Sequence, residues 1–578
     1  MKAAVEYQVG CADPRTHLFD VVMTVAEPAA GQQVSLPVWI PGSYMVREFS
    51  RHLQHLSARQ GKRAVGLRQL NKNTWAVDAR AGQALELRYQ VYAFDPSVRA
   101  AFLDAQRGFF NGTSLCLQAH GQQDRPHAIT VQRPKACPGW QVATGLSAQR
   151  VDAGGWGRYV AHDYDELIDS PFEWGTFWSG QFVAAGVPHR LVVSGATPSF
   201  DGERLLKDTE RICTAAIRMW HGRGKPVHRH YLFMLHVVED GYGGLEHRNS
   251  TALIGSRRDL PRLGEKGSSE AYLTLLGLIS HEYFHTWNVK RLRPAEFARY
   301  DLNAENHTEL LWFFEGFTSY FDDLLLVRAG LLTPKAYLER LAKTITSVDQ
   351  TPGRKVQSVA QSSFDAWTRY YRQDENTPNA TVSYYTKGSL IALCLDLALR
   401  AEGSDLAAVM RGLWKRCAAG PMREADLLDE LQAQTGRAWH TEIHDWVHTT
   451  ADLPLARLLR AQGVQIDTER APLAQRLGLR ASDSASGVMI KAVLRGGAAE
   501  QAGMAAGDEW LAVEVGSGKR AQSWRLKKLD DLLLLLGTAT RCRALICRDQ
   551  HLHWLDLKLP QLASNWTLSP GPDLKGWL

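Results

Sequence analysis

Residues 271–285 read AYLTLLGLISHEYFH, a nearly uninterrupted apolar run that ends in His281, Glu282 and His285. On a helix, positions i and i+4 lie on the same face one turn apart, so both imidazoles can reach one metal ion. Polar side chains at the end of a buried helix need partners, because an unpaired polar group is costly in an apolar environment. A metal supplies that partner. The pattern therefore predicts a zinc site in which Glu282 acts on a metal-bound water.

A third ligand is expected from residues 310–326, which read LLWFFEGFTSYFDDLLL and contain Glu315. A carboxylate among phenylalanines is unfavourable unless it is ionically paired, and Gly316 beside it permits close approach of another helix. Asp322 lies two helical turns further along the same face and is expected to orient a ligand histidine, with Asp323 as the alternative. Three protein ligands leave one coordination position open on a single zinc ion per chain, which is typical of catalytic sites.

The composition is that of a folded globular protein, since 45% of the 578 residues are apolar and 22% are charged. The 67 basic and 61 acidic residues give a net charge of +6, too small to indicate nucleic-acid binding. No apolar stretch reaches the ~18 residues of a membrane-spanning helix. The eight cysteines are scattered without a CxxC pair, and the N-terminus lacks the apolar core of a signal peptide. We therefore expect a cytoplasmic protein without a disulfide framework.

The chain changes character three times, which predicts a multidomain protein. Residues 1–178 contain alternating segments such as ALELRYQVYAF (84–94) and are expected to form a β-sandwich. Residues 179–455 combine apolar strands with long helical patterns. Residues 462–560 are again β-rich, and the tail from 561 to 578 is rich in turn residues and expected to be loosely ordered.

The sequence resembles the gluzincin metallopeptidases in two segments, HEYFHTWNVKRLRP (281–294) and FFEGFTSYFDD (313–323). More specifically, it resembles the glycyl aminopeptidase family, metallopeptidase family 61. That resemblance extends to WIPGSYMVREF (39–49), DELIDSPFEWG (165–175), GYGGLEHRNS (241–250) and YYTKG (384–388). It implies a thermolysin-like α+β zinc peptidase domain with a helical C-terminal part, with zinc held by His281, His285 and Glu315.

The resemblance also implies roles in substrate binding. Gly243 and Gly244 would line the cleft and hold the peptide backbone, and Glu246 would bind the α-ammonium group; glycine permits such close approach of a ligand. His247 stands where the larger aminopeptidase family usually has Asn. In the YYTKG segment, Tyr385 would donate a hydrogen bond to the oxyanion, with Tyr384 as the alternative.

Residues 487–513 resemble a PDZ domain, with a strand, a short helix and a glycine-containing turn. A later helix over 526–536 would form one wall of a groove beside the strand 487–493, and such a groove takes an extended peptide as an added strand. The loop that holds a peptide carboxylate would lie near Leu477-Gly478-Leu479. The chain's own end, Lys575 to Leu578, could occupy this groove within one molecule or between molecules, or could be disordered.

We therefore predict a zinc aminopeptidase that acts on peptides with a free N-terminus, with Glu282 as general base and acid. The family resemblance suggests a preference for Gly or Ala. One alternative is a non-enzymatic scaffold that binds C-terminal peptides through its PDZ-like domain. Another is an endopeptidase with the same chemistry, and the role of Glu246 distinguishes it from an aminopeptidase.

Overall fold

The computed structural model describes residues 1–578 except 1–2, 486, 561–563 and 575. Its internal contacts form two compact units. The first comprises Met1–Asn306, Phe321–Leu332 and Met410–Asp426, and the second comprises His307–Tyr320, Thr333–Val409 and Leu427–Leu578. Helix α5 (Leu311–Arg328) contributes residues to both. Within the described part of the chain, no helix is long and apolar enough to cross a membrane.

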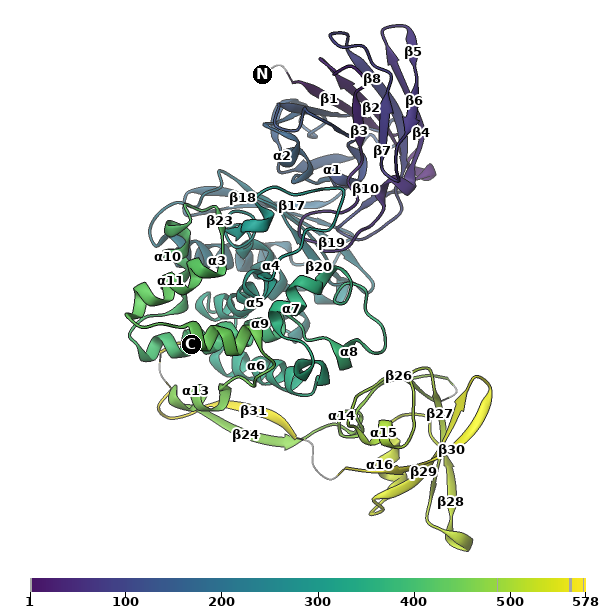
Figure 1. Ribbon diagram of the computed structural model, residues 1–578, viewed down its shortest axis with the longest axis vertical. Helices are drawn as coiled ribbons and strands as arrows, with labels where there is room; N and C mark the ends of the chain where they lie inside the picture. The colour runs from purple at the N-terminus through teal and green to yellow at the C-terminus, as the bar shows by residue number, and fades with distance from the viewer. Residues whose placement is uncertain (1–2, 486, 561–563, 575) are drawn as a thin grey trace. The chain divides into compact units, whose positions relative to one another are not determined.

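The N-terminal domain is β-rich, as predicted (Figure 1). Its largest sheet has eight strands in the order β14-β15-β12-β1-β2-β8-β4-β5, and all neighbours are antiparallel except β1 and β12. These strands are β1 (Val5–Gly10), β2 (Leu18–Val25), β4 (Leu53–Gln60), β5 (Arg63–Val65), β8 (Leu85–Tyr92), β12 (His127–Val131), β14 (Ser147–Val151) and β15 (Gly157–Ala161). In β2 and β8, buried side chains alternate with more exposed ones, because one face of the sheet covers a core.

Two four-stranded sheets complete this domain, in the orders β13-β16-β10-β9 and β11-β3-β7-β6. Their strands are β3 (Gln33–Ser35), β6 (Leu67–Gln69), β7 (Thr74–Val77), β9 (Ala101–Leu103), β10 (Arg107–Phe110), β11 (Gln118–Ala119), β13 (Gln141–Thr144) and β16 (Phe172–Gly175). The next strand, β17, begins at Trp178 and belongs to a different sheet. The N-terminal sheets therefore end close to the expected boundary at residue 178.

A five-stranded mixed sheet follows, in the order β17-β18-β19-β21-β20. Its strands are β17 (Trp178–Ala184), β18 (Val187–Ser194), β19 (Tyr231–Val238), β20 (Gly243–Glu246) and β21 (Ser250–Ser256). The three central strands are parallel and the two outer strands are antiparallel to their neighbours. Helix α3 (Gly202–His221) contacts β17, and helix α4 (Glu270–Phe284) contacts β20 and β21. Among the described residues, no strand other than β21 pairs with β20, so one edge of β20 is available to another chain.

Helix α4 begins where the Ser269 side chain accepts a hydrogen bond from the Tyr272 amide. It ends at Phe284, immediately before the second ligand histidine, His285. The chain turns here because the Nδ1 atom of His285 contacts the Asn288 carbonyl oxygen at 2.8 Å and Val289 adopts a left-handed φ of 100°. The end of α4 is thus fixed by a contact of a predicted metal ligand.

The second unit is helical up to about residue 461. Helix α6 (Pro334–Asp349) starts with Thr333 as its cap and Pro334 in its first turn. The other principal helices are α7 (Val359–Phe364), α9 (Thr386–Ala401) and α13 (Leu455–Ala461). Helices α10 (Leu406–Arg416) and α11 (Glu424–Thr435) lie partly in each unit.

A small module with its own core occupies most of the residues after 470. Its sheet has the order β25-β26-β27-β29-β30, with β28 paired to β27. The elements are α14 (Leu473–Leu477), β25 (Leu479–Asp483), β26 (Val488–Val493), α15 (Ala498–Gln501), β27 (Glu509–Val515), β28 (Gln522–Arg525), α16 (Asp531–Leu536), β29 (Arg541–Arg548) and β30 (His551–Lys558). Strand β26 pairs with β25 on one side and with β27 on the other, so the predicted peptide groove beside 487–493 is wrong; among the described residues, the edge strands of this sheet are β25 and β30.

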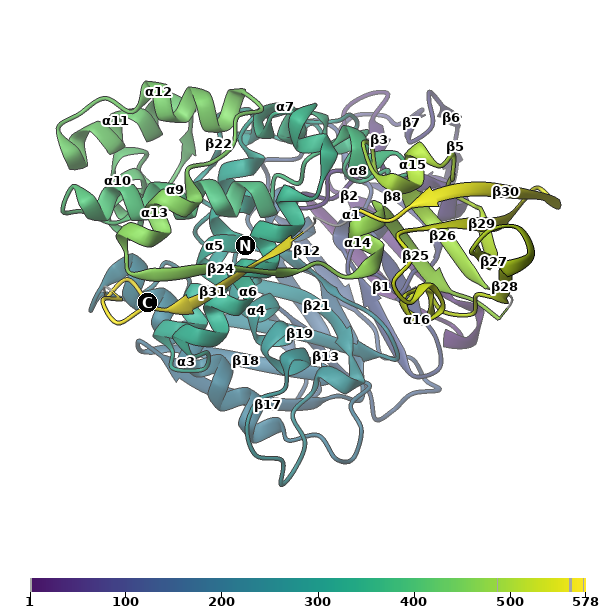
Figure 2. The same ribbon diagram turned by 90° about the horizontal axis from the view of Figure 1, so that it is seen from below.

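The expectation of a loosely ordered tail is also wrong. Strand β31 (Ser564–Pro570) pairs antiparallel with β24 (Val464–Arg470), and both lie outside the module's sheet (Figure 2). Strand β31 packs on α6, and further along the chain the Trp577 ring is buried 6.0 Å from that of Tyr337 on the same helix. Burial of these apolar surfaces outweighs the turn-rich composition of the segment. Lys575, which the tail hypothesis included, lies outside the described residues.

Candidate metal centre

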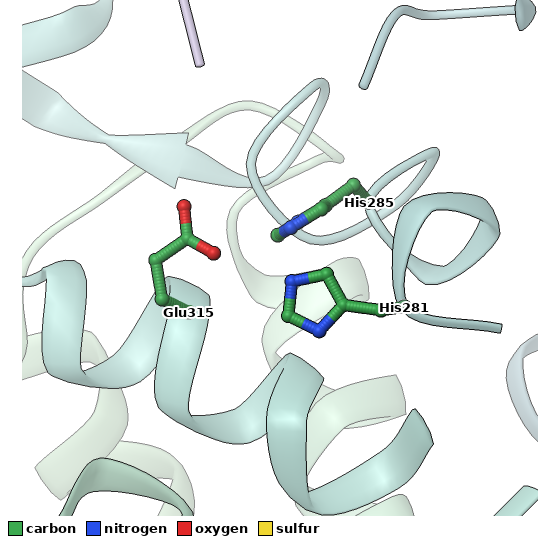
Figure 3. A group of neighbouring side chains, drawn as sticks. All are labelled: His281, His285 and Glu315. Atoms are coloured by element: carbon green, nitrogen blue, oxygen red, sulfur yellow. The ribbon is translucent and has the colours of Figure 1, made fainter. Parts of the chain in front are cut away.

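The three predicted metal ligands come together. His281, His285 and Glu315 each offer one ligand atom, and these atoms lie within 4.8 Å of one another (Figure 3). His285 and Glu315 are 1% and 2% exposed, and His281 is half-buried. Two imidazoles and a carboxylate converging on one point fit a zinc ion with a remaining position for a further ligand.

Each histidine uses its Nδ1 atom for a contact within the protein. His281 Nδ1 lies 3.1 Å from Asp322 Oδ2, and His285 Nδ1 lies 2.8 Å from the Asn288 carbonyl oxygen. Such contacts fix the ring orientation and leave Nε2 for a metal. The sequence pointed to Asp322 for this contact. The contact with Asn288 could not be predicted, because it is made by a backbone carbonyl, which every residue has.

Helix α5 is positioned on both sides of Glu315. The Ser280 hydroxyl donates to the Asp322 carbonyl oxygen at 2.9 Å, which joins α4 to α5. At Gly316, a Cβ atom would lie 2.6 Å from the Cα of Gly388 on α9, a separation that real side chains do not adopt. The two helices therefore touch through their backbones, as the glycine after Glu315 predicted, and the contact sets the depth of that carboxylate.

Glu282 lies directly against the edge strand β20. A Cβ atom on Gly244 would come within 2.1 Å of Glu282 Oε1, so only glycine fits there. Glu282 itself is 5% exposed. The predicted general base and the predicted peptide-binding strand are thus adjacent.

Glu246 lies on β20, two residues after Gly244. Because side chains alternate along a strand, Glu246 projects from the face of β20 on which Gly244 meets Glu282. It is 4% exposed, and both of its carboxylate oxygens lie 2.6 Å from where a Cβ on Gly42 would be. Among the described residues, no donor or cation hydrogen-bonds or pairs with this carboxylate. A buried carboxylate in that state favours binding of a cation.

The residue after Glu246 is held by a buried charge network. Asp169 accepts hydrogen bonds from Lys290 Nζ at 2.7 Å, from His247 Nδ1 at 3.1 Å and from the Arg248 amide at 3.1 Å. Burial raises the pKa of Asp169, but Lys290 and His247 outweigh it and bring the pKa down to about 2. His247 thus anchors the end of β20 to the segment that contains Asp169. The sequence could not reveal this link between distant residues.

The two candidate tyrosines differ in their surroundings. Tyr384 is fully buried against the rings of Tyr370 and Tyr385, at 4.6 and 4.7 Å between ring centroids. Tyr385, immediately before α9, is less buried than Tyr384, and its pKa is raised far above the ordinary value by burial and then by the nearby Glu315. Tyr370, which the sequence did not single out, also has a raised pKa, caused first by burial and in part by Glu315. A tyrosine hydroxyl is protonated at neutral pH, so that of Tyr385 can donate a hydrogen bond.

Comparison with known proteins gives two family matches. A model described as the Peptidase M61 N-terminal domain matches residues 6–176, and one described as M61 glycyl aminopeptidase matches residues 274–391. The chain is similar to the crystal structure of an aminopeptidase N family protein from Idiomarina loihiensis, with 36% identity, a TM-score of 0.94 and coverage of 99% of this chain and 100% of that one. An M1 zinc metallopeptidase from Deinococcus radiodurans is 16% identical with a TM-score of 0.49, over 78% of this chain and 94% of its own. No curated protein matches the chain.

Proposed function

Because the chain belongs to the M61 glycyl aminopeptidase family and is a zinc metallopeptidase, we propose that it removes the N-terminal residue from peptides. His281, His285 and Glu315 hold one zinc ion. The observation that supports an aminopeptidase rather than an endopeptidase is Glu246, a buried carboxylate without a partner on the strand that borders Glu282. A substrate's α-ammonium group is the cation that such a carboxylate would bind.

Zinc at this site would polarise the scissile carbonyl and lower the pKa of the attacking water. Glu282 takes a proton from that water and then delivers it to the leaving amine. Tyr385 donates a hydrogen bond to the oxygen that becomes negatively charged. The open edge of β20, at Gly243 and Gly244, aligns the peptide backbone, while Asp322 keeps the His281 ring in its orientation.

We also propose a preference for Gly or Ala at the cleaved residue; the description of the matched family, glycyl aminopeptidase, supports Gly. For the C-terminal module, we propose a PDZ-like peptide-binding role at β25. Among the described residues, that strand is one of the two edges of the sheet, with β30 as the other, and it alone follows directly on the Leu477-Gly478 turn. A ligand there would be an extended C-terminal peptide added as a further strand.

The experiment is hydrolysis of glycyl and alanyl p-nitroanilides and of their N-acetylated forms, with zinc and with a chelator. We expect chelator-sensitive cleavage of the free-amine substrates only. Glu246→Ala should weaken their cleavage by about 2–5 kcal/mol of transition-state binding, whereas the exposed Glu239→Ala should have no such effect. Equal cleavage of acetylated substrates would identify an endopeptidase, and absence of any hydrolysis would favour the scaffold alternative.

A further inference from the structure

Arg99 reaches from the N-terminal domain to the open edge of β20. Its Nη2 atom donates to the Gly244 carbonyl oxygen at 3.2 Å. A Cβ atom on Gly243 would lie 3.7 Å from both Nη1 and Nη2. Both segments belong to the same compact unit. The guanidinium group therefore lies along the two residues that border Glu282.

Most of the donors of this guanidinium are unused. Of its five N–H groups, one has the Gly244 oxygen as acceptor, and the Nε atom is buried without any acceptor. Within the described ranges of the chain, no carboxylate forms an ion pair with Arg99. A permanently charged, half-buried group without a counter-ion is a site for an anion, and its planar fork favours a carboxylate.

The position along β20 indicates which carboxylate this is. Strand β20 runs from Gly243 through Gly244 to Glu246, and the three-residue step between Gly243 and Glu246 spans about 10 Å. In the proposed function, the substrate amine lies at Glu246 and the scissile bond lies beside Glu282, next to Gly244. The part of the peptide on the C-terminal side of the scissile bond then extends past Gly243, where the Arg99 guanidinium lies. Only in a short peptide does the C-terminal carboxylate fall so close to the scissile bond.

We propose that Arg99 binds the C-terminal carboxylate of dipeptide and tripeptide substrates, so that the enzyme is selective for short peptides with a free carboxyl end. This inference rests on the proposed function, since it takes the direction of the substrate from Glu246. A bidentate pair would use the unused donors of the guanidinium while the Gly244 contact holds the side chain in place.

The test compares Ala-Gly-Gly with Ala-Gly-Gly-amide in the zinc-loaded full-length protein. We expect kcat/KM of the native protein to favour the free acid by about ten-fold or more, mainly through KM, since charge-assisted hydrogen bonds are among the stronger ones. Arg99→Gln should bring this acid-to-amide ratio close to one. Arg99→Lys, which keeps the charge but loses the fork, should give an intermediate ratio. Arg258→Gln is the control, because Arg258 is exposed and paired with Glu239 at 2.7 Å, and it should keep the native ratio.

A native ratio near one overturns the proposal, and that measurement requires no variant to fold. The same conclusion follows if Arg99→Gln retains the native ratio. In either case, cleavage of alanyl p-nitroanilide would show that the proposed function itself stands. If the native protein cleaves neither peptide nor the p-nitroanilide, the proposed function fails and this inference fails with it.

Discussion

The metal-ligand helices and the C-terminal module are held by different kinds of contact. At Gly316 and Gly388, α5 and α9 touch through their backbones, with 2.6 Å between a Cβ on Gly316 and the opposite Cα. The module instead meets the helices through polar side chains. The Asn379 side-chain amide donates to the Val493 carbonyl oxygen at 2.9 Å and accepts from the Arg495 backbone amide at 2.8 Å, and the Gln350 side chain donates to Gln475 Oε1 at 3.4 Å. Water can replace a polar contact of the second kind, whereas one added methyl group disturbs the first. The metal centre should therefore respond sharply to single substitutions, and the module should not affect it.

The largest effect is expected from loss of a metal ligand. Glu315→Ala and His285→Ala should abolish both zinc binding and peptide hydrolysis, because two remaining ligands do not complete the site. Zinc content by atomic absorption, together with p-nitroanilide turnover, measures this. Glu309→Ala is the matched control, since that side chain is exposed just before α5. Retention of stoichiometric zinc by Glu315→Ala would contradict the assignment.

The next effect concerns the buried charges at the end of β20. Asp169→Asn leaves Lys290, which is 5% exposed, without its anion, and should destabilise the protein by about 3–5 kcal/mol at neutral pH. The pKa of Asp169 is lowered from 3.8 to about 2, so its contribution is complete above pH 4 and disappears as the pH falls toward 2. The free energy of unfolding of the zinc-free protein, determined at several pH values, measures this contribution of Asp169 to stability.

In that series, the difference in the free energy of unfolding between the native protein and Asp169→Asn should decrease as the pH falls below 4. Asp165→Asn serves as the control, because Asp165 pairs with Arg248 but its side chain is 45% exposed. Such an exposed ion pair should contribute only about 0–1 kcal/mol to the free energy of unfolding. Equal destabilisation by both variants would show that burial is not what makes the network strong.

The contact between Asp322 and His281 should have a smaller effect. Asp322→Asn is expected to weaken zinc affinity or activity by about 10- to 100-fold, because it removes the carboxylate that orients the ring. Titration with a competing chelator measures the affinity. Asp323→Asn is the neighbouring control, and a larger effect there would reassign the orienting role to Asp323.

The grouping of the three candidate ligands was predictable from the sequence, because zinc requires particular residue types at helical spacing. This requirement predicted that His281, His285 and Glu315 lie together on two helices, α4 and α5, with Asp322 near a ligand histidine. The contacts through Gly244 and the Asn288 carbonyl oxygen were not predictable in detail, because they depend on backbone positions. Asp169 and His247 meet only in the folded chain. The peptide groove beside 487–493 was misassigned because strand order, rather than local pattern, decides which strand forms an edge. Strand β31 was missed because Pro570, Gly571 and Pro572 suggested disorder, while Trp566 binds Asp349 through its indole N–H at 2.8 Å.

The smallest effect on catalysis is expected from shortening the chain after Pro560, which removes β31. The module should become easier to release by limited proteolysis between 461 and 473, because β24 loses its only paired strand among the described residues. Zinc content should not change. A chain shortened after Gly571 keeps β31 and should resist proteolysis more. Loss of zinc from the shorter chain would show that the module supports the metal centre after all.

The most direct test of the central claim is Glu282→Gln, measured for zinc content and for hydrolysis of alanyl p-nitroanilide in the same preparation. Glutamine keeps the size of the side chain against Gly244 but cannot accept the proton. The account predicts one zinc per chain, as in the native protein, with turnover reduced by about 10²- to 10⁴-fold. Near-normal turnover with zinc bound would contradict the role of Glu282 and the mechanism that depends on it.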